Sequence, residues 1–505
     1  MEVSSKGHPT RAVLSLAVAS RVLVAALFLL WRNVANPYDT SAELSLPCLS
    51  SNSCTSQEEH QQPIWGQRLG KAIQRTVVWD GVYYIRIAEC GYEYEQAYAF
   101  FPAFPLLIRL MSQTIFYNLI PVLGLRPTLA LSGYVITNLS FVLAAYYLYR
   151  LSKQVLEDEK QALVAVALFC FNPASTFYSA IYSESLFALF SFAGLWHFLN
   201  GARWTAIALF GLSSGVRSNG VLHAGFILFQ AMHKAYDVAF CQKRLLAVVP
   251  IILVALFQSA GVVTPYVAFQ RYGFIQLCLH EGIPETRPWC SKTIPHLYSF
   301  VQSYYWNVGF LRYFQFKQLP NFVLASPMLC LAVCGIVTYA RNQPRLFFLL
   351  GLAASPSTRA RVALMPPSDS KAAVTFDQQG LKPMVAIELT SNSLNDTEKL
   401  RNRKGSKRIP GTSDLEAEPL KQTGFNSLGS ICFLIQLCVM VATAVFVMHV
   451  QVATRFLSVS PPVYWYGAYL MNHSKKQELR YIMWTVFFSY IGLGSLLFIN
   501  FYPFT

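Results

Sequence analysis

The sequence predicts an all-α, polytopic membrane protein with about ten transmembrane helices. Three observations support this fold class. Hydrophobic residues make up 54% of the 505 residues and charged residues only 13%. The apolar residues gather into blocks long enough to cross about 30 Å of hydrocarbon, and short basic stretches separate many of these blocks. The composition argues against a set of soluble domains and excludes a disordered scaffold and a nucleic-acid reader.

Ten apolar blocks are the predicted spans, and ten crossings would place both termini on the same side of the membrane. The first block is expected to be an anchor and not a cleaved signal peptide, because Arg21 interrupts it and Trp31-Arg32 follows it instead of small residues. The blocks are residues 12–31, 128–149, 161–181, 184–200, 204–216, 220–236, 245–265, 320–340, 428–450 and 481–500.

Short connections that carry Lys and Arg, such as those around Arg150 and Arg203, are predicted to be cytosolic. The longer stretches 33–127, 266–319 and 451–480 then lie on the opposite, lumenal face. They hold nearly all the Asp, Glu, His and Trp residues that could perform chemistry, which favours an enzyme. The apolar piece 99–123 is predicted to form helices on the membrane surface.

The chain is expected to divide into three parts. Residues 1–354 form a transmembrane catalytic core, and residues 428–505 form a C-terminal transmembrane pair. The hydrophilic insertion 355–427 between them is predicted to be disordered and cytosolic, which requires the run 346–354 to enter the membrane without crossing it. The insertion has 11 basic and 8 acidic residues, so its share of the formal charge of +15 does not require an anionic ligand.

Four cysteines fall in the predicted lumenal loops. An oxidising lumen would allow a Cys48–Cys54 or a Cys278–Cys290 disulfide. Neither spacing is that of a metal site, and no metal or cofactor is expected.

Three ionisable residues lie in or near predicted spans: Arg21, Glu184 and Arg217. An unpaired ionisable group in a membrane is costly, so each is a candidate for a functional site. The alternative is that Glu184 lies at the interface while both arginines extend toward it.

The sharpest candidate for catalysis is the run Trp79-Asp80-Gly81-Val82-Tyr83-Tyr84, with Glu89 and an aromatic segment after it. A carboxylate among aromatic rings suits glycosyl transfer, because it supplies a base for an acceptor hydroxyl while the rings hold a sugar face. Alternatively, Asp80 only caps a surface helix.

Polar groups at 172–185 and the glycine-flanked run 215–220, a predicted broken helix, converge on the same rim. The loop after the seventh predicted span, 266–319, carries cations such as Lys292 and Arg312, which could bind a phosphate or could simply be solvated. The sequence lacks nucleotide-binding motifs, HExxH and an Asp-x-Asp pair. A donor that is itself a lipid phosphate would need none of these.

Several of these motifs together resemble the phosphatidylinositol-glycan class V family, the GPI mannosyltransferase 2 enzymes. The resemblance covers nearly the whole chain, apart from 33–70 and 355–427. It rests on the runs 79–102, 172–184, 215–220, 305–311, 320–322 and 449–457.

The resemblance implies an endoplasmic-reticulum enzyme with the GT-C type of fold and a lumenal active site. Such an enzyme transfers mannose from dolichol-phosphate-mannose to the GPI precursor glycolipid, adding the second mannose in α1,6 linkage with inversion. A small accessory membrane subunit is a further expected partner. Some family members carry His where Cys90 stands, so Cys90 is not expected to be an obligatory acid or base.

The same resemblance assigns the site residues. Asp80, as general base, and Glu89 are the candidate catalytic residues. The candidate substrate-binding residues are Trp79, Tyr83, Glu184, Arg217, Asn219, Gln302, Trp306, Asn307, Arg312 and Arg455.

Two alternatives stay open. The aromatic loops, the cationic rim and the broken span at 215–220 would also suit a transporter or flippase of lipid-linked phosphates, although no internal duplication is evident. A GT-C mannosyltransferase with a different acceptor would use the same donor and the same first-loop acid.

Overall fold

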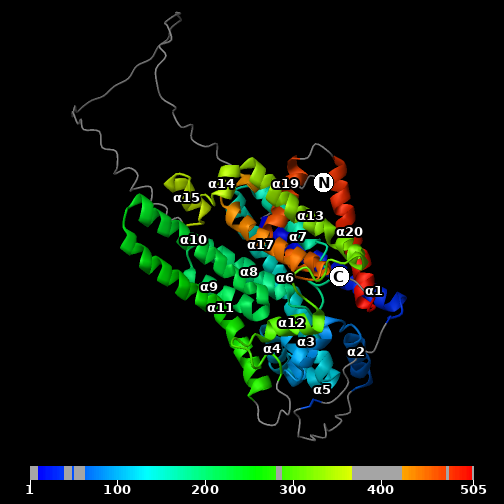
Figure 1. Cartoon of the computed structure of the whole chain (residues 1–505). Coiled ribbons are helices and arrows are strands. Elements are labelled where there is room, and N and C mark those ends of the chain that lie inside the picture. Colours follow the sequence, from blue (N-terminus) through cyan, green and yellow to red (C-terminus); the bar gives the residue numbers. More distant parts are fainter. Residues whose placement is uncertain are drawn as a thin grey trace, which may run out of the picture.

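The computed structural model describes residues 9–38, 48–49, 63–279, 287–366, 423–473 and 477–502. This part of the chain is built from helices and turns and contains no β-strand, which confirms the predicted all-α class. Long helices form a bundle, and shorter helices gather at its lower end in Figure 1. We call these shorter helices the end layer: α2 (Ile64–Gln74), α3 (Asp80–Cys90), α4 (Ala103–Gln113), α5 (Ile120–Leu123) and α12 (Leu297–Trp306).

Five helices are long and apolar enough to cross a membrane alone: α1 (Pro9–Val34), α6 (Leu125–Leu156), α11 (Val248–Cys278), α13 (Leu319–Asn342) and α20 (Gln477–Ile499). The other predicted spans contain shorter helices, which are α7 (Glu159–Cys170), α8 (Glu184–Leu199), α9 (Arg203–Val216), α10 (Ala224–Tyr236) and α17 (Ser430–Phe446). A multi-pass helical membrane protein is therefore the observed architecture, with fewer full-length spans than the apolar blocks predicted.

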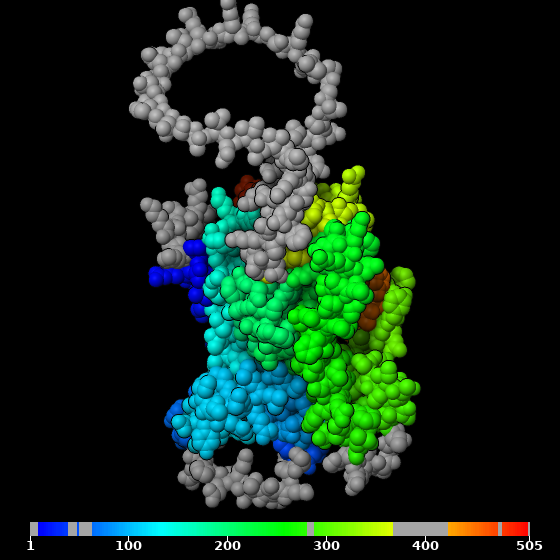
Figure 2. All heavy atoms as spheres, turned by 90° about the vertical axis from the view of Figure 1, so that its left-hand side faces the viewer, coloured from blue at the N-terminus to red at the C-terminus, as the bar shows by residue number. Residues whose placement is uncertain are grey.

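The end layer confirms that the two longest predicted loops meet at one end. Figure 2 shows the blue and cyan residues of the first loop region beside the green residues of the second, and α12 packs against the turn Glu95–Ala99. Segment 99–123 bends by 71° between α4 and α5, so it does not form one straight span.

The predicted span 161–181 is wrong in its second half, because α7 ends at Cys170. Pro173 has no N–H to donate within a helix and disfavours the helical conformation of Asn172 before it. The side chain of Asn172 also competes with helical hydrogen bonding, because it donates to the Phe169 carbonyl oxygen at 2.6 Å and accepts from the Ala174 N–H at 2.7 Å. Residues 171–183 therefore form a buried series of turns, which we call the central turn.

The predicted loop 451–480 is wrong in that it contains a buried helix, α19 (Pro461–His473), which packs against α7 and α13. The Trp465 indole N–H donates to Ser152 Oγ on α6 at 2.7 Å. Apolar runs do not reveal this helix, because Tyr and Trp provide much of its buried surface. Likewise, the predicted boundary at 265 is wrong, since α11 continues to Cys278.

The two described ends of the chain lie at opposite ends of the bundle. The end of α20 lies beside the end of α1, since Asn500 Nδ2 donates to the Trp31 carbonyl oxygen at 3.3 Å. The first residue of α1 is a helix length away, about 39 Å for 26 residues. The prediction that both ends share one side is therefore wrong for the described residues.

Around 346–354 the chain forms two short helices, α14 (Pro344–Phe348) and α15 (Pro356–Val362), and neither is long enough to span a membrane. Most of the insertion, 367–422, lies outside the described residues.

The structure contains the predicted Cys278–Cys290 disulfide. Cys48 pairs with Cys90 and not with Cys54, which lies outside the described residues. The Leu49 N–H donates to Glu93, which brings this segment to the end of α3.

Candidate active site

Asp80 is the first residue of α3, and an unusual turn precedes it. Trp79 has φ 54°, a left-handed conformation that a bulky residue rarely adopts. The surrounding structure maintains it, because the Trp79 indole N–H donates to the Phe498 carbonyl oxygen on α20 at 3.1 Å. The N-cap residue of α3 is Trp79 and not Asp80, and it makes no side-chain capping bond. The alternative that Asp80 only caps a helix is therefore wrong.

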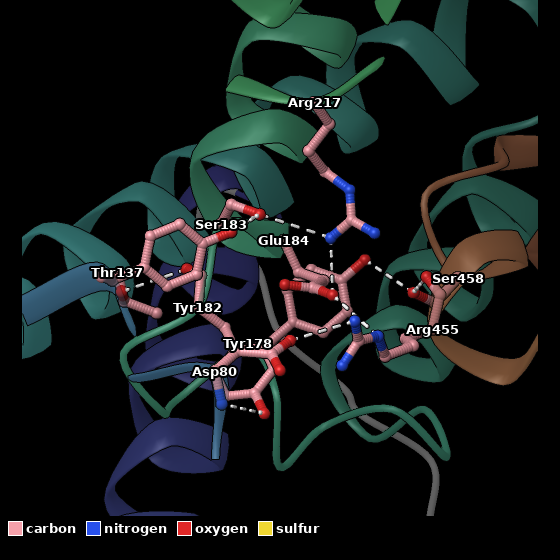
Figure 3. Close-up of polar contacts among 10 residues, drawn as sticks. Asp80, Thr137, Tyr178, Tyr182, Ser183, Glu184, Arg217, Arg455 and Ser458 are labelled. Atoms are coloured by element: carbon pink, nitrogen blue, oxygen red, sulfur yellow. Dashed lines mark hydrogen bonds and ion pairs between the residues drawn. The ribbon is translucent and has the colours of Figure 1, made fainter. Parts of the chain in front are cut away.

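Four charged side chains from different elements meet at this point, as Figure 3 shows. Asp80 comes from α3, Glu184 from the first residue of α8, Arg217 from the end of α9, and Arg455 from α18 (Ala453–Leu457). Arg455 Nη2 lies 3.2 Å from Asp80 Oδ2, and Arg455 Nε lies 3.3 Å from Glu184 Oε1. Arg217 Nη1 lies 2.5 Å from the same Glu184 oxygen. We call these four residues the charged cluster.

The two carboxylates of the charged cluster differ in exposure. The Glu184 side chain is 1% exposed, whereas the Asp80 side chain is 32% exposed. Only Asp80 can therefore present its carboxylate to a ligand without a rearrangement. Partial burial raises the pKa of Asp80 above its ordinary value, and the neighbouring Arg455 opposes the rise.

The central turn supplies aromatic and hydroxyl groups that support the charged cluster. The Asp80 N–H donates to the Tyr182 hydroxyl oxygen at 3.1 Å. The Arg455 guanidinium lies over the rings of Phe177 and Tyr182, 5.1 and 5.3 Å from their centroids. Arg217 donates to Ser183 Oγ at 3.4 Å. Tyr182 and Ser183 lie in the polar run 172–185, but the sequence gives no reason to choose these two residues from it.

Arg21 neither extends to the membrane interface nor joins the charged cluster. It is 4% exposed, and its guanidinium donates to the carbonyl oxygens of Ser175, in the central turn, and of Cys170, at the end of α7.

A cavity of about 550 Å³ adjoins Asp80. Its lining brings together three of the predicted binding residues, Trp79, Tyr83 and Trp306. It also includes residues that sequence reasoning did not select: Tyr38, Arg86, Glu93, Tyr94, Gln96 and Phe501. Single aromatic or charged residues in long loops carry no signal that would separate them from their neighbours.

The remaining predicted residues take no part in the ion pairs of the charged cluster. Glu89 pairs with Arg126 at 2.9 Å. Arg312 is exposed and donates to Ser303 Oγ at 2.8 Å. The other three are Asn219, in the 3₁₀ helix Ser218–His223; Gln302, one turn before Trp306; and Asn307, which ends α12 at φ 52°.

Among the described residues, one group of metal-binding residue types lies close together: Cys48, Cys90 and Glu93. Both cysteines are disulfide-bonded, so this group does not offer thiolate ligands. In the charged cluster, each carboxylate already pairs with a guanidinium.

The chain matches the family model described as mannosyltransferase (PIG-V) over residues 10–505. The GPI alpha-1,6-mannosyltransferase 2 of Cricetulus griseus is 32% identical over 485 residues, which cover 92% of this chain and 84% of the relative. The human protein of the same name is 31% identical over 432 residues, 80% of this chain and 75% of the relative. The GPI mannosyltransferase 2 of Drosophila pseudoobscura is 28% identical over 526 residues, covering 98% of this chain and 99% of the relative.

No solved structure shows a significant match to this chain. The names of the three relatives are those of transferases, which favours an enzyme over the alternative of a transporter. With a family match that extends over almost its entire length, this chain belongs to the PIG-V mannosyltransferase family.

Proposed function

We propose that this protein transfers mannose from dolichol-phosphate-mannose to a GPI precursor glycolipid in α1,6 linkage, with Asp80 as general base. The names of its relatives support the reaction and the acceptor. The observation that carries the catalytic assignment is that Asp80 alone, of the two carboxylates in the charged cluster, is accessible.

In the proposed step, Asp80 accepts the proton of an acceptor hydroxyl while the hydroxyl oxygen attacks the anomeric carbon of mannose. A carbon–oxygen bond to the acceptor forms, and the bond from mannose to the lipid phosphate breaks. The phosphate leaves with the electron pair. Attack from the face opposite the phosphate inverts the anomeric configuration.

Arg217 and Arg455 are the proposed partners of the donor phosphate, because guanidinium groups bind phosphate oxygens through two parallel hydrogen bonds. Glu184 pairs with both arginines and is enclosed. We therefore assign Glu184 to positioning these two guanidiniums and not to direct substrate binding.

The proposed site faces the lumen of the endoplasmic reticulum. Both disulfides of the described residues lie in or beside the end layer, which supports an oxidising compartment on this side. The exposed apolar length of α11 offers a surface for the proposed accessory membrane subunit.

The test uses microsomes that lack this protein, supplied with radiolabelled mannose and either the wild type, Asp80→Asn or the control Glu478→Gln, which changes an exposed carboxylate at the start of α20. We expect intermediates with one mannose to accumulate without the protein and with Asp80→Asn, whose transfer rate falls by about 10²–10⁴-fold. Full transfer by Asp80→Asn would remove Asp80 from the mechanism. Failure of another mannose-dependent pathway, with this one intact, would show that the acceptor is wrong.

A further inference from the structure

The cavity beside Asp80 is closed on one side by the ends of α1 and α20. The Tyr38 N–H, just after α1, donates to the Asn500 carbonyl oxygen at 2.8 Å. Asn500 in turn donates to the Trp31 carbonyl oxygen at 3.3 Å. Tyr38 and Phe501 both line the cavity, and these bonds hold them together as one wall.

This wall is aromatic. The rings of Trp79 and Phe501 are 5.7 Å apart between centroids, and those of Tyr38 and Tyr502 are 5.5 Å apart. Other aromatic residues, Tyr83 and Trp306, also line the cavity. Tyr83 stacks on Phe100 with centroids 4.8 Å apart, which limits the movement of its ring. Rings therefore line the cavity from α3, from α12 and from the segments that directly follow α1 and α20.

The cavity also has a fixed polar part. Arg86 Nε lies 2.7 Å from Glu93 Oε2, and these side chains are 7% and 4% exposed. The Cys48–Cys90 disulfide and the Leu49 N–H, which donates to Glu93, hold this part of the wall from outside. Gln96 adds an amide to the lining.

We propose that this cavity binds the glycan of the acceptor glycolipid, with Phe501 and Tyr38 as contacts that determine acceptor specificity. Rings that pack on the faces of a sugar, together with polar groups that bind its hydroxyls, such as the Gln96 amide and the accessible Asp80 carboxylate, are the chemistry that recognises a carbohydrate. The volume of about 550 Å³ exceeds what one hexose ring requires, so the site accommodates a short glycan.

The position of the cavity separates the acceptor from the donor. Asp80 lines the cavity, whereas Glu184, Arg217 and Arg455 do not. A glycan in the cavity would bring a hydroxyl to the accessible Asp80 carboxylate, while the arginines remain on the side of the lipid phosphate. The inference rests on the proposed function of Asp80, and its test separates acceptor binding from catalysis.

The first experiment measures steady-state transfer in detergent with the full-length protein and purified acceptor glycolipid bearing one mannose. We expect Phe501→Ala and Tyr38→Ala each to raise the KM for the acceptor by about tenfold, with kcat and the KM for the donor unchanged. Phe501→Tyr retains the ring and should stay near the wild type. The matched control is Phe488→Ala, an exposed phenylalanine on α20 outside the cavity lining.

An acceptor KM that changes no more than in Phe488→Ala, or a change in the donor KM instead, would overturn the assignment. A second experiment does not depend on turnover. A photoreactive benzoylphenylalanine replaces Phe501 in a chain that also carries Asp80→Asn, and radiolabelled acceptor is added. We expect a cross-link that excess unlabelled acceptor removes, and none from position 488.

If position 501 cross-links but the Asp80→Asn protein is active, the acceptor site is supported and the role of Asp80 as general base is refuted. If the Asp80→Asn protein is inactive but position 501 does not cross-link, the role of Asp80 is supported and the acceptor site is refuted.

Discussion

Arg21, in the middle of the first membrane helix, donates a hydrogen bond to the carbonyl oxygen of Cys170 at 3.0 Å, where α7 ends. The last carbonyls of a helix have no partner within it and carry partial negative charge. Arg21 also donates to the Ser175 carbonyl oxygen and to Ser179 Oγ, both at 2.9 Å, and its guanidinium lies 3.8 Å from the centroid of the Phe141 ring. A cation inside the bundle thus satisfies the backbone of the central turn.

Replacement of Arg21 by Met should therefore destabilise the protein and impair transfer. The change leaves buried carbonyl oxygens unpaired at about 1–3 kcal/mol each. It also releases the turn that supplies Tyr182 and Ser183. We expect a lower midpoint of thermal unfolding in detergent and a smaller fraction of active protein. Arg11→Met, at an exposed position of the same helix, is the control and should match the wild type. Equal midpoints for both variants would show that Arg21 is not needed.

The pH dependence of transfer should report the environment of Asp80. A base must be deprotonated to act, so activity is lost as the pH falls through its pKa. Burial raises the pKa of Asp80, Glu184 adds to the rise, and Arg455 and Arg217 oppose it. We therefore expect kcat/KM to fall on acidification at a pH above the ordinary pKa of an Asp carboxyl group.

Replacing Arg455 by Gln removes the larger opposing charge, so the pKa of Asp80 rises further and the acidic limb should move to higher pH. The measurement is kcat/KM over a pH series in detergent. Arg312→Gln, which removes an exposed arginine outside the charged cluster, should leave the limb in place. A limb that stays fixed or moves to lower pH in Arg455→Gln would contradict the assignment of Asp80.

Gly220 should not tolerate a side chain. A Cβ atom there would overlap the backbone of Ser213 and Ser214 at the end of α9, and backbone cannot move aside as a flexible side chain does. We expect Gly220→Ala to lower the midpoint of thermal unfolding and to reduce transfer, because Arg217 follows the displaced turn. Gly225→Ala, in α10 with no atom within 4 Å of the added Cβ, is the matched control and should be neutral or stabilising. Equal effects would refute this packing argument.

The sequence predicted the helical class, the end layer and the local motif around Asp80 because those features depend on apolar blocks and short-range patterns. It did not reveal α19, whose buried surface is largely Tyr and Trp, or the end of α7 inside a predicted span. It predicted all four residues of the charged cluster but not that they meet. Asp80 and Arg455 are 375 positions apart, and only the packing of the helices brings them together. For the same reason, the sequence did not predict that Phe501 lies in the cavity wall near Asp80.

The strongest test of the charged cluster is the coupling between Glu184 and Arg217. Removing one partner of a buried ion pair leaves the other charge uncompensated, which typically costs about 3–5 kcal/mol. Glu184→Gln and Arg217→Gln should therefore each destabilise the protein more than an exposed substitution does. The double variant should cost clearly less than the sum of the two single changes, since it leaves no unpaired member of this pair.

The measurement is a double-mutant cycle on stability in detergent, with transfer recorded in parallel. Glu184→Gln should lower transfer even where the protein remains folded, because Arg217 and Arg455 lose the carboxylate that aligns them. Lys153 and Glu159, an exposed pair at 3.0 Å, provide the control cycle, for which coupling should stay below about 1 kcal/mol. Additive costs at Glu184 and Arg217 would mean that the two side chains act independently, and Glu184 would then lose its proposed positioning role.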